Sequence, residues 1–348
     1  GETVERAMSL LDRKREGIIV DTTTAGLLAG RFTIEEHAAE DGTLRVLAGE
    51  SRAVRTLLGR PSRLIGRTRE LVTLEAMLDE VRGERVSRAM VVLAEPGFGK
   101  SRLVAALGQR AAANGTTTWT SWGDPATRGS PLSMLRGFML SAADISDADR
   151  APIRQRKIAH RVAQLGCSPE VGELLTETVA PLEPGGPELR AVRRDRLLFA
   201  TSLRNAWCAL VTAACRAGPL MLVLEDLHWG DARTVELVDA ALHAARDLPL
   251  FVVAAGRPDL AKTFPDLFSA HGTQQLKLLG LTPRASAELV RHALPSLPEP
   301  AVAAIVTRAQ GNALFLEELI RAAAEGRSDS PETLVAMMQQ RLSLLGSE

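Results

Sequence analysis

The chain has 348 residues, and its 42 Lys and Arg residues are balanced by 42 Asp and Glu residues, so the formal net charge is zero. This balance excludes an overall basic field that would draw the whole chain onto nucleic acid or an anionic membrane. Aromatic residues make up only 3% of the chain and Tyr is absent, which argues against a stacking surface for single-stranded nucleic acid. The chain is long enough for more than one folded unit.

The cysteines and the apolar pattern bear on the cellular compartment. The three cysteines, Cys167, Cys208 and Cys215, have no metal-ligand spacing, and their odd number indicates buried thiols in a reducing environment. The sequence shows no signal-peptide pattern, and no apolar run approaches the roughly 20 residues that span a bilayer. We therefore expect a cytoplasmic protein with no membrane partner.

Residues 1–48 are expected to form a small α/β segment. Apolar residues at helical spacing predict a helix at 4–11, and strand-like runs follow at 17–20 and within 32–47. Such a segment is too small to bury a core of its own. Residues 49–62 mix Arg, Gly and Pro, which is typical of a connector between domains.

The first 30 residues resemble the C-terminal end of a class III nucleotide cyclase domain. The family pattern there is approximately G-x-x-V-N-x-A-x-R-L, then G-x-I and V-S/D-x-x-T, and the chain has GETVERAMSL, GII and VDTTT. Glu5 and Ser9 stand where the family has its Asn and Arg, which stabilise the transition state. The resemblance implies a remnant of the cyclase fold without cyclase activity, and a plain α/β linker is the alternative.

The next feature is the sequence LIGRTREL, which leads into an amphipathic helix. The glycine of this motif admits close approach of another group to the backbone. The motif begins with Leu64, Ile65, Gly66 and Arg67 and stands about 30 residues ahead of a glycine-rich loop, a place where many nucleotide-binding proteins hold the adenine. Taken alone, the same residues would suit a surface turn equally well.

The stretch AMVVLAEPGFGKSRLV, residues 89–104, carries the strongest signal in the chain. An apolar strand at 88–93 stops at a loop rich in Gly and Pro, and a helix is expected at 101–113. The usual phosphate-loop pattern is G-x-x-x-x-G-K-S/T, and Ala94 replaces its first glycine here. The strand, loop and helix setting predicts a nucleotide-binding loop, and the alternative is a turn that ends in GKS by chance.

Each position of this loop has a physical role. Gly97 and Gly99 let successive N–H groups turn inward around a polyphosphate. Lys100 supplies a positive charge for the outer phosphates, the helix N-terminus adds its partial charge, and the Ser101 hydroxyl can ligate Mg²⁺. The nucleotide is expected to contact the whole run of Glu95, Pro96, Gly97, Phe98, Gly99, Lys100, Ser101 and Arg102.

The central part of the chain is predicted to be mostly helical. A β-branched strand at 116–121 is followed by a helical pattern over 123–217, with breaks at Gly166 and at 181–187. The basic run at 150–161 could be a nucleic-acid patch, but neighbouring Asp residues favour a solvated helix face.

A second buried strand, LMLVL at 220–224, ends in the acidic pair Glu225 and Asp226. Acidic residues at the carboxyl end of a parallel strand face the crevice into which the phosphate loop also opens. Glu225 is placed to hold Mg²⁺, and Asp226 to orient or deprotonate the attacking water. The following His228 and Trp229 are read as hydrogen-bonded and packed residues, because no Cys or His partners accompany them as metal ligands.

A third apolar strand at 248–255 ends in GRPD, and a last short strand is expected at 275–278. Arg257 can reach a γ-phosphate from this strand end and report its presence. A surface arginine is the alternative reading. From Thr282 onward the pattern is helical, with a hinge at 295–300.

The C-terminal helical pattern contains the sequence GNALFLEEL. Asn312 is expected to cap a helix that stops at Gly326, and a further helix is expected after Pro331.

Residues 63–348 resemble the STAND class of AAA+-related signal-transduction ATPases. The marks are LIGRTREL, EPGFGKSRL, LVLEDLHWGD, AAGRPD and GNALFLEEL, in that order. Ala94 and Ala313 depart from the family, which has Gly and Pro there, and these changes should weaken binding without abolishing it. The resemblance implies that Arg257 is the sensor and that the adenine lies between residues 64–67 and the turn formed by Gly311, Asn312, Ala313 and Leu314.

The predicted fold is an α/β P-loop NTPase with a parallel sheet flanked by helices, followed by a helical lid. Residues 1–48 would be the cyclase-like piece and 49–62 the linker. Residues 63–280 would form the NTPase core, and 281–348 the lid and the start of a further helical region.

The predicted function is a regulatory ATPase module of a multidomain signal-transduction protein. It would bind ATP or ADP with Mg²⁺, hydrolyse ATP slowly and switch between the two bound states. Its partners would be proteins or other domains of a longer chain. Copies of the chain could also form a nucleotide-dependent oligomer. Two alternatives stay open: a scaffold that binds nucleotide without turnover, and an AAA+ motor in which Arg233 or Arg246 serves as an inter-subunit arginine finger.

Overall fold

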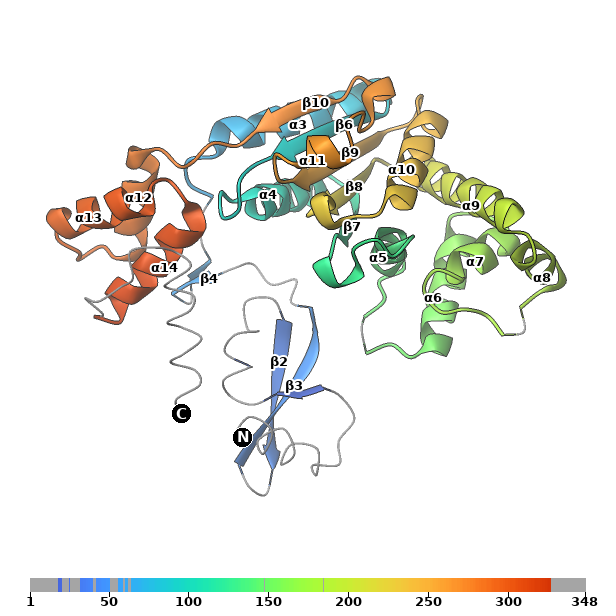
Figure 1. Cartoon of the computed structure of the whole chain (residues 1–348), viewed down its shortest axis with the longest axis horizontal. Helices are drawn as coiled ribbons and strands as arrows, with labels where there is room; N and C mark the ends of the chain where they lie inside the picture. Colours follow the sequence, from blue (N-terminus) through green and yellow to red (C-terminus); the bar gives the residue numbers. More distant parts are fainter. Residues whose placement is uncertain are drawn as a thin grey trace.

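A computed structural model of the chain describes residues 18–20, 25, 32–39, 42–50, 56–58, 60–61, 64–146, 148–183 and 185–326. A parallel sheet with helices on both faces forms the centre, and helical regions lie at its two ends (Figure 1). A small antiparallel sheet precedes them in the chain. The predicted fold class is therefore confirmed. The expected helices at 4–11 and after Pro331 lie outside the described residues, as do Glu5 and Ser9.

The central sheet has five parallel strands in the order β10-β6-β9-β8-β7. The strands are β6 (Arg88–Leu93), β7 (Thr117–Trp122), β8 (Leu220–Glu225), β9 (Leu250–Gly256) and β10 (Gln274–Lys277). All five were expected from apolar or β-branched runs at nearly the same bounds. Because the strands are parallel, the loops after their carboxyl ends meet at one edge of the sheet.

Alternate residues of the three inner strands, β6, β8 and β9, enter two separate apolar clusters, one on each face. On one face, Met90 and Val92 pack with α3 (Thr68–Glu84) and α4 (Lys100–Ala113). On the other face, the sheet packs with α5 (Ser133–Ala142), α9 (Arg196–Ala217) and α10 (Ala232–Ala244). Burial on both faces explains why the strands are continuous apolar runs.

The region between β7 and β8 is helical, as predicted. It contains α5, α6 (Ala151–Gln164), α7 (Pro169–Thr176), α8 (Pro187–Arg193) and α9, and Gly166 separates α6 from α7 with a φ of +70°. The basic run lies on α6, where Lys157 pairs with Asp149 at 2.6 Å. Ile158 of the same helix is fully buried. The run is therefore an amphipathic helix whose charged face has an acidic partner.

Helix α9 corrects the expectation that no segment could span a membrane. Among the described residues it is long and apolar enough to do so by length and composition alone, with a mean hydropathy of 1.3. In the structure Trp207 and Leu210 of α9 are fully buried in the cluster beneath the sheet.

Three helices follow the sheet: α12 (Pro283–Ala293), α13 (Glu299–Ala309) and α14 (Ala313–Ala324). They share an apolar cluster that contains no residue of the central sheet. The predicted hinge is shorter than 295–300, because α13 already begins at Glu299. Pro300 fits in its first turn, where a missing N–H removes no helical hydrogen bond.

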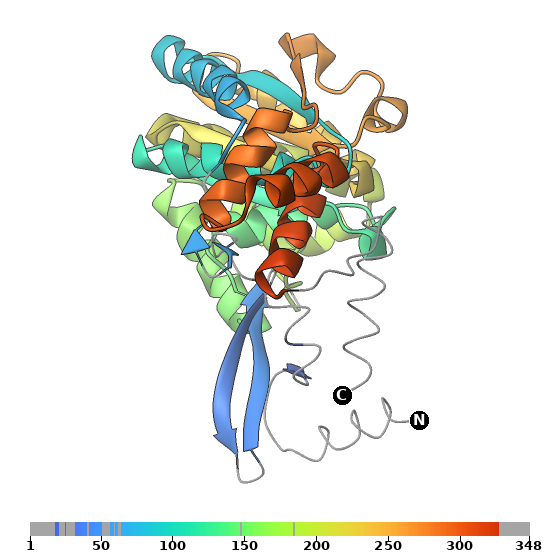
Figure 2. The same cartoon turned by 90° about the vertical axis from the view of Figure 1, so that its left-hand side faces the viewer.

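The N-terminal sheet consists of β1 (Ile18–Val20), β2 (Phe32–Ala39) and β3 (Gly42–Glu50) in the antiparallel order β1-β3-β2. Figure 2 shows β2 and β3 as a twisted ribbon that extends away from the helices. The expected linker contains a short hairpin of β4 (Thr56–Leu57) and β5 (Arg60–Pro61). Leu57 is buried in the cluster of α12–α14, so part of this segment packs against the C-terminal helices.

Candidate nucleotide-binding site

The glycine-rich loop connects β6 to α4 at the carboxyl edge of the sheet. Gly97 and Gly99 have φ values of +82° and +91°, a conformation that side chains disfavour. Ala94 has no positive φ, and its methyl group is buried in the cluster with α3 and α4. The substitution at the first glycine position therefore leaves the loop geometry intact.

The N-terminus of α4 is open toward this loop. Its N-cap is Gly99, so no side chain caps the first N–H groups, which remain available to an anion. Lys100 is buried, and its Nζ donates to the carbonyl of Ala94 at 2.8 Å. Burial lowers the pKa of Lys100, while the nearby carboxylate of Asp226 opposes that shift. A phosphate would add charge compensation for this ammonium.

Ser101 and Glu225 meet across the site. The Ser101 hydroxyl donates to Oε2 of Glu225 at 2.9 Å, and Glu225 is buried at the end of β8. Two oxygen ligands at right angles around Mg²⁺, each about 2.1 Å away, stand about 3 Å apart. The separation of these two oxygens therefore suits adjacent positions in the coordination shell of Mg²⁺.

Asp226 occupies the left-handed region of the backbone, with φ 47° and ψ 39°. Aspartate tolerates this conformation better than most residues, but it remains unusual outside glycine. The turn lifts Asp226 out of β8, and its side chain stays 46% exposed beside the buried Glu225. The two neighbouring carboxylates thus have different surroundings, which matches the different roles that the sequence predicts for them.

Arg257 follows β9 and lies over the indole ring of Trp229, 5.7 Å from the ring centroid. It is near enough to Lys100 that its charge also lowers the pKa of that residue. His228 is buried, and neither ring nitrogen has a hydrogen-bond partner among the described residues. Burial lowers the pKa of His228. The expected hydrogen bond of His228 is therefore wrong, since the ring packs against Trp229 instead.

The segment of Leu64 to Arg67 joins the sheet to the C-terminal helices. Leu64 packs against the cluster of α3 and α4, and Ile65 against the cluster of α12–α14. A Cβ on Gly66 would meet Cβ of Ala285 at 2.6 Å, so in this structure the glycine permits close approach of α12.

The sequence did not indicate the structural role of Arg67. This residue is buried, and its Nη2 donates to the carbonyls of Phe98 at 2.9 Å and Leu279 at 2.6 Å. One side chain thus ties the phosphate loop to the connection between β10 and α12. No local sequence pattern predicts that an arginine will be buried between segments that are distant in the chain.

The turn before α14 contacts the phosphate loop directly. Leu314 N donates to the carbonyl of Gly97 at 3.0 Å, and Asn312 Nδ2 donates to that of Pro96 at 3.1 Å. Asn312 also caps α14 as predicted, accepting from Phe315 N. A Cβ on Gly97 would come within 2.4 Å of the Asn312 side chain, so the glycine is needed for this approach. The structure thus brings Asn312 and Leu314 to the loop.

An ion pair strengthens the same contact. Nη1 of Arg102 on α4 lies 2.5 Å from Oε1 of Glu317 on α14, and both side chains are largely buried. The Gly311 carbonyl accepts from Leu281 N at 2.8 Å, which fixes the turn to the start of the C-terminal helices.

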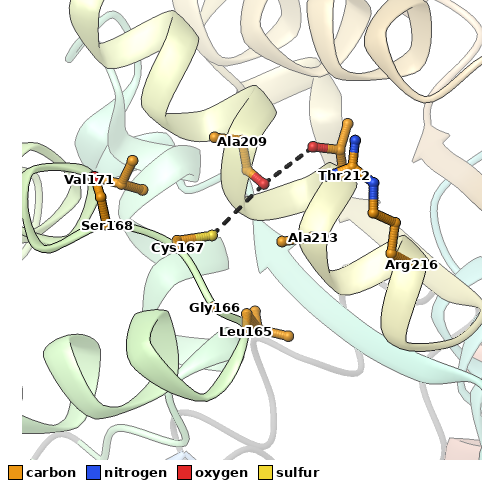
Figure 3. A pocket seen from close by; sticks show the side chains of 9 residues that line it. All are labelled: Leu165, Gly166, Cys167, Ser168, Val171, Ala209, Thr212, Ala213 and Arg216. Atoms are coloured by element: carbon orange, nitrogen blue, oxygen red, sulfur yellow. Dashed lines mark hydrogen bonds between the residues drawn. The ribbon is translucent and has the colours of Figure 1, made fainter.

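A surface cavity of about 410 Å³ lies away from the phosphate loop, between the α6–α7 turn and α9 (Figure 3). The Cys167 thiol in its wall points toward the carbonyl of Ala209 (Figure 3). Of the three cysteines, only Cys215 is fully buried, which raises its pKa to about 12. Cys167 and Cys208 are half-buried, so the expectation of buried thiols holds for one residue of the three.

Comparison with known proteins gives a family match for residues 63–253, with a family described as AAA ATPase domain. No curated protein matches the chain. Solved structures that are similar to it include the following three. A DNA replication initiation factor has 12% identity over 75% of this chain and 62% of its own, with a TM-score of 0.42. A Signal Transduction ATPase with Numerous Domains (STAND) protein with a tetratricopeptide repeat sensor from Pyrococcus horikoshii has 10% identity. The match covers 82% of this chain and 33% of that protein, with a TM-score of 0.42. AMPPCP-bound DnaA from Aquifex aeolicus has 12% identity over 74% of this chain and 61% of its own, with a TM-score of 0.40. The chain spans less than two thirds of the length of each.

Proposed function

The chain belongs to the AAA ATPase domain family, and on that premise we propose that it is a regulatory ATPase module that binds ATP or ADP with Mg²⁺ and hydrolyses ATP slowly. The observation that carries the proposal is the contact of the α14 turn with the phosphate loop, in which Leu314 N donates to the Gly97 carbonyl. Any nucleotide that reshapes this loop changes a hydrogen bond to the C-terminal helices. Nucleotide state and helix position are thereby coupled.

The residues of the site divide the chemistry among them. The open N–H groups of α4 and the Lys100 ammonium hold the phosphates, and Ser101 and Glu225 would hold Mg²⁺. When bound, Mg²⁺ would offset the negative charge that develops on the phosphate oxygens. Asp226, half-exposed at the strand end, orients the attacking water or accepts its proton. Arg257 contacts the γ-phosphate and distinguishes ATP from ADP.

The C-terminal helices act as the lid in this proposal. Residues 63–280 form the NTPase core, and residues from 281 onward close over the adenine, which the Leu64 to Arg67 segment borders from the other side. Shifting the ratio of closed to open lid from about 1:99 to 99:1 requires a ligand whose binding free energies to the two states differ by roughly 5.5 kcal/mol. A charge-assisted contact from Arg257 and ion coordination by Glu225 are the groups able to supply such a difference.

The wider assignment rests on the sequence. The ordered motifs make this a STAND-like signal-transduction protein in the cytoplasm, with proteins or other domains of a longer chain as partners. Residues 1–48 are a cyclase-like remnant without cyclase activity, because Glu5 and Ser9 replace the residues that stabilise the cyclase transition state.

Hydrogen exchange of α12–α14 in the absence of nucleotide, with ADP and with ATP tests the proposal. We expect a distinct exchange pattern in each of the three states. Arg257→Ala should reduce the difference in exchange between the ATP and ADP complexes while leaving the affinity for ADP nearly unchanged. Single-turnover measurements should show hydrolysis that is slow relative to binding. Identical exchange in all three states would contradict the lid and favour a static nucleotide-binding scaffold.

A further inference from the structure

Trp229 lies beside two arginines that come from different loops. The Arg257 guanidinium carbon is 5.7 Å from the centroid of the indole ring, and that of Arg128 is 5.2 Å from it. Arg257 follows β9, whereas Arg128 follows β7, which is two strands away in the sheet order. The sequence motifs gave no role to Arg128. Two guanidinium groups from different loops thus lie around one aromatic ring at the carboxyl edge of the sheet.

The backbone around Arg128 holds it in this place. Gly123 N donates to the Glu225 carbonyl at 2.8 Å, which extends the pairing of β7 with β8 by one residue. A Cβ on Gly123 would lie 2.4 Å from the Asp226 carbonyl oxygen, so the loop after β7 presses against the loop after β8. Asp124 then caps a short 3₁₀ turn by accepting from Ala126 N, and Arg128 ends that turn. The contacts of Gly123 and Asp124 therefore fix the position of Arg128 in the backbone.

The two guanidinium groups leave their N–H donors unused. Among the described residues, neither the Arg128 nor the Arg257 guanidinium forms a hydrogen bond or an ion pair, and both lie near the indole ring of Trp229. An aromatic face attracts a guanidinium while leaving its in-plane donors open. Positive side chains around one ring, without carboxylates in ion-pair contact with them, favour the arrival of an anion. The phosphate loop follows β6 and so opens at the same carboxyl edge of the sheet as the loops that carry Arg128 and Arg257.

We propose that Trp229 is a platform that presents both Arg128 and Arg257 to the terminal phosphate of a nucleoside triphosphate, so that Arg128 is a second recognition residue for that phosphate. The inference rests on the proposed function, because it assigns its ligand to the same nucleotide site. ADP has no terminal phosphate at this position. The pair therefore discriminates between the two nucleotides and contributes little to binding of the part they share.

The test compares ATP and ADP affinities by calorimetry in the parent protein and in Arg128→Gln. Because charge-assisted hydrogen bonds are the strong ones, we expect ATP to bind about 10-fold or more weakly in the variant, with ADP affinity changed less than about twofold. Arg128→Lys should restore part of the ATP affinity, since it keeps the charge without the planar fork. Arg85→Gln is the matched control, because Arg85 is an exposed arginine at the end of α3.

Tryptophan fluorescence tests whether Trp229 lies at the terminal phosphate. If Trp229 only stabilised the fold, its emission would not differ between the ATP and ADP complexes. The parent should show a difference in Trp emission between its ATP and ADP complexes, and Trp229→Phe should lose it while remaining folded. Equal weakening of ATP and ADP in Arg128→Gln, or no weakening of either, would overturn the inference while leaving the proposed function standing. Failure of the parent protein to bind either nucleotide would remove both.

Discussion

The helices at the two ends of the sheet are attached to it in different ways (Figure 1). Helices α5, α6, α7 and α9 share one continuous apolar cluster with the sheet. Helices α12–α14 have a separate cluster and meet the phosphate loop through hydrogen bonds of Asn312 and Leu314 and the ion pair of Glu317. Water can replace polar contacts at a small net cost, whereas separating an apolar cluster exposes its whole surface. We therefore expect the C-terminal helices, rather than α5, α6, α7 and α9, to move relative to the sheet.

The largest effect is expected at the apolar attachment, from Trp207→Ala. Trp207 is fully buried, with its ring centroid 6.2 Å from that of Trp119 and 5.7 Å from that of Phe138. Removing it should lower the free energy of unfolding by about 3–5 kcal/mol, as measured by denaturant titration. Trp122→Ala is the control, because that residue is 47% exposed at the end of β7. Similar losses in the two variants would contradict a buried apolar attachment at Trp207.

The same contrast explains which features the sequence predicts. Strands β6, β7, β8 and β9 can be predicted because each is an apolar or β-branched run. Gly97, Gly99 and Lys100 can be predicted because phosphate binding demands those residue types in that order. Packing between distant segments leaves no such local pattern. For this reason the burial of Arg67 and the partnership of Arg128 with Trp229 emerge only from the structure.

Some differences have causes that can be named. The hairpin of β4 and β5 falls in a stretch with the composition of a connector, and it is ordered against α12–α14 through Leu57. Gly66 was expected to admit close approach of another group, and in the structure that group includes Ala285 of α12. In both cases the residue type was compatible with several partners, and tertiary contacts decided which one it meets.

The next effect concerns turnover at the polar side, in Asp226→Asn. The change keeps the size of the side chain but removes the carboxylate that would accept or orient a proton, so hydrolysis should fall about 10²-fold or more. Binding of ATP should persist, because Lys100 and the α4 N-terminus are untouched. Phosphate release in single turnover measures the loss. Asp247→Asn, at a highly exposed aspartate, is the matched control. Equal hydrolysis in parent and Asp226→Asn would exclude Asp226 from the reaction.

A smaller effect is expected on affinity from Lys100→Ala. The variant removes a full charge from the phosphate loop while the backbone donors of α4 remain, so affinity for ATP should fall by about an order of magnitude or more. Calorimetry gives the dissociation constant directly. Lys157→Ala removes the same charge from α6, far from the loop, and should leave nucleotide affinity unchanged. Unaltered ATP affinity in Lys100→Ala would contradict the assignment of the loop.

The smallest effect concerns the polar attachment itself and is expected from Glu317→Gln. The ion pair of Arg102 and Glu317 joins α4 to α14, with exposed side-chain fractions of 22% and 12%. Glutamine can still accept a hydrogen bond but loses the charge, so the contact should weaken by roughly 1 kcal/mol. Opening of the C-terminal helices would then become about fivefold more frequent. Hydrogen exchange of α14 without nucleotide measures this opening.

Glu318→Gln is the control for this last prediction because it makes the same substitution one residue further along α14. Glu318 pairs with Arg321 of the same helix, whereas the ion pair between α14 and α4 is made by Glu317. Faster exchange in Glu317→Gln alone, with the denaturation midpoints of both variants close to that of the parent, would identify the ion pair as a latch between lid and loop. Equal exchange in the two variants and the parent would show that the backbone bond from Leu314 to Gly97 and the Asn312 contact hold α14 without it.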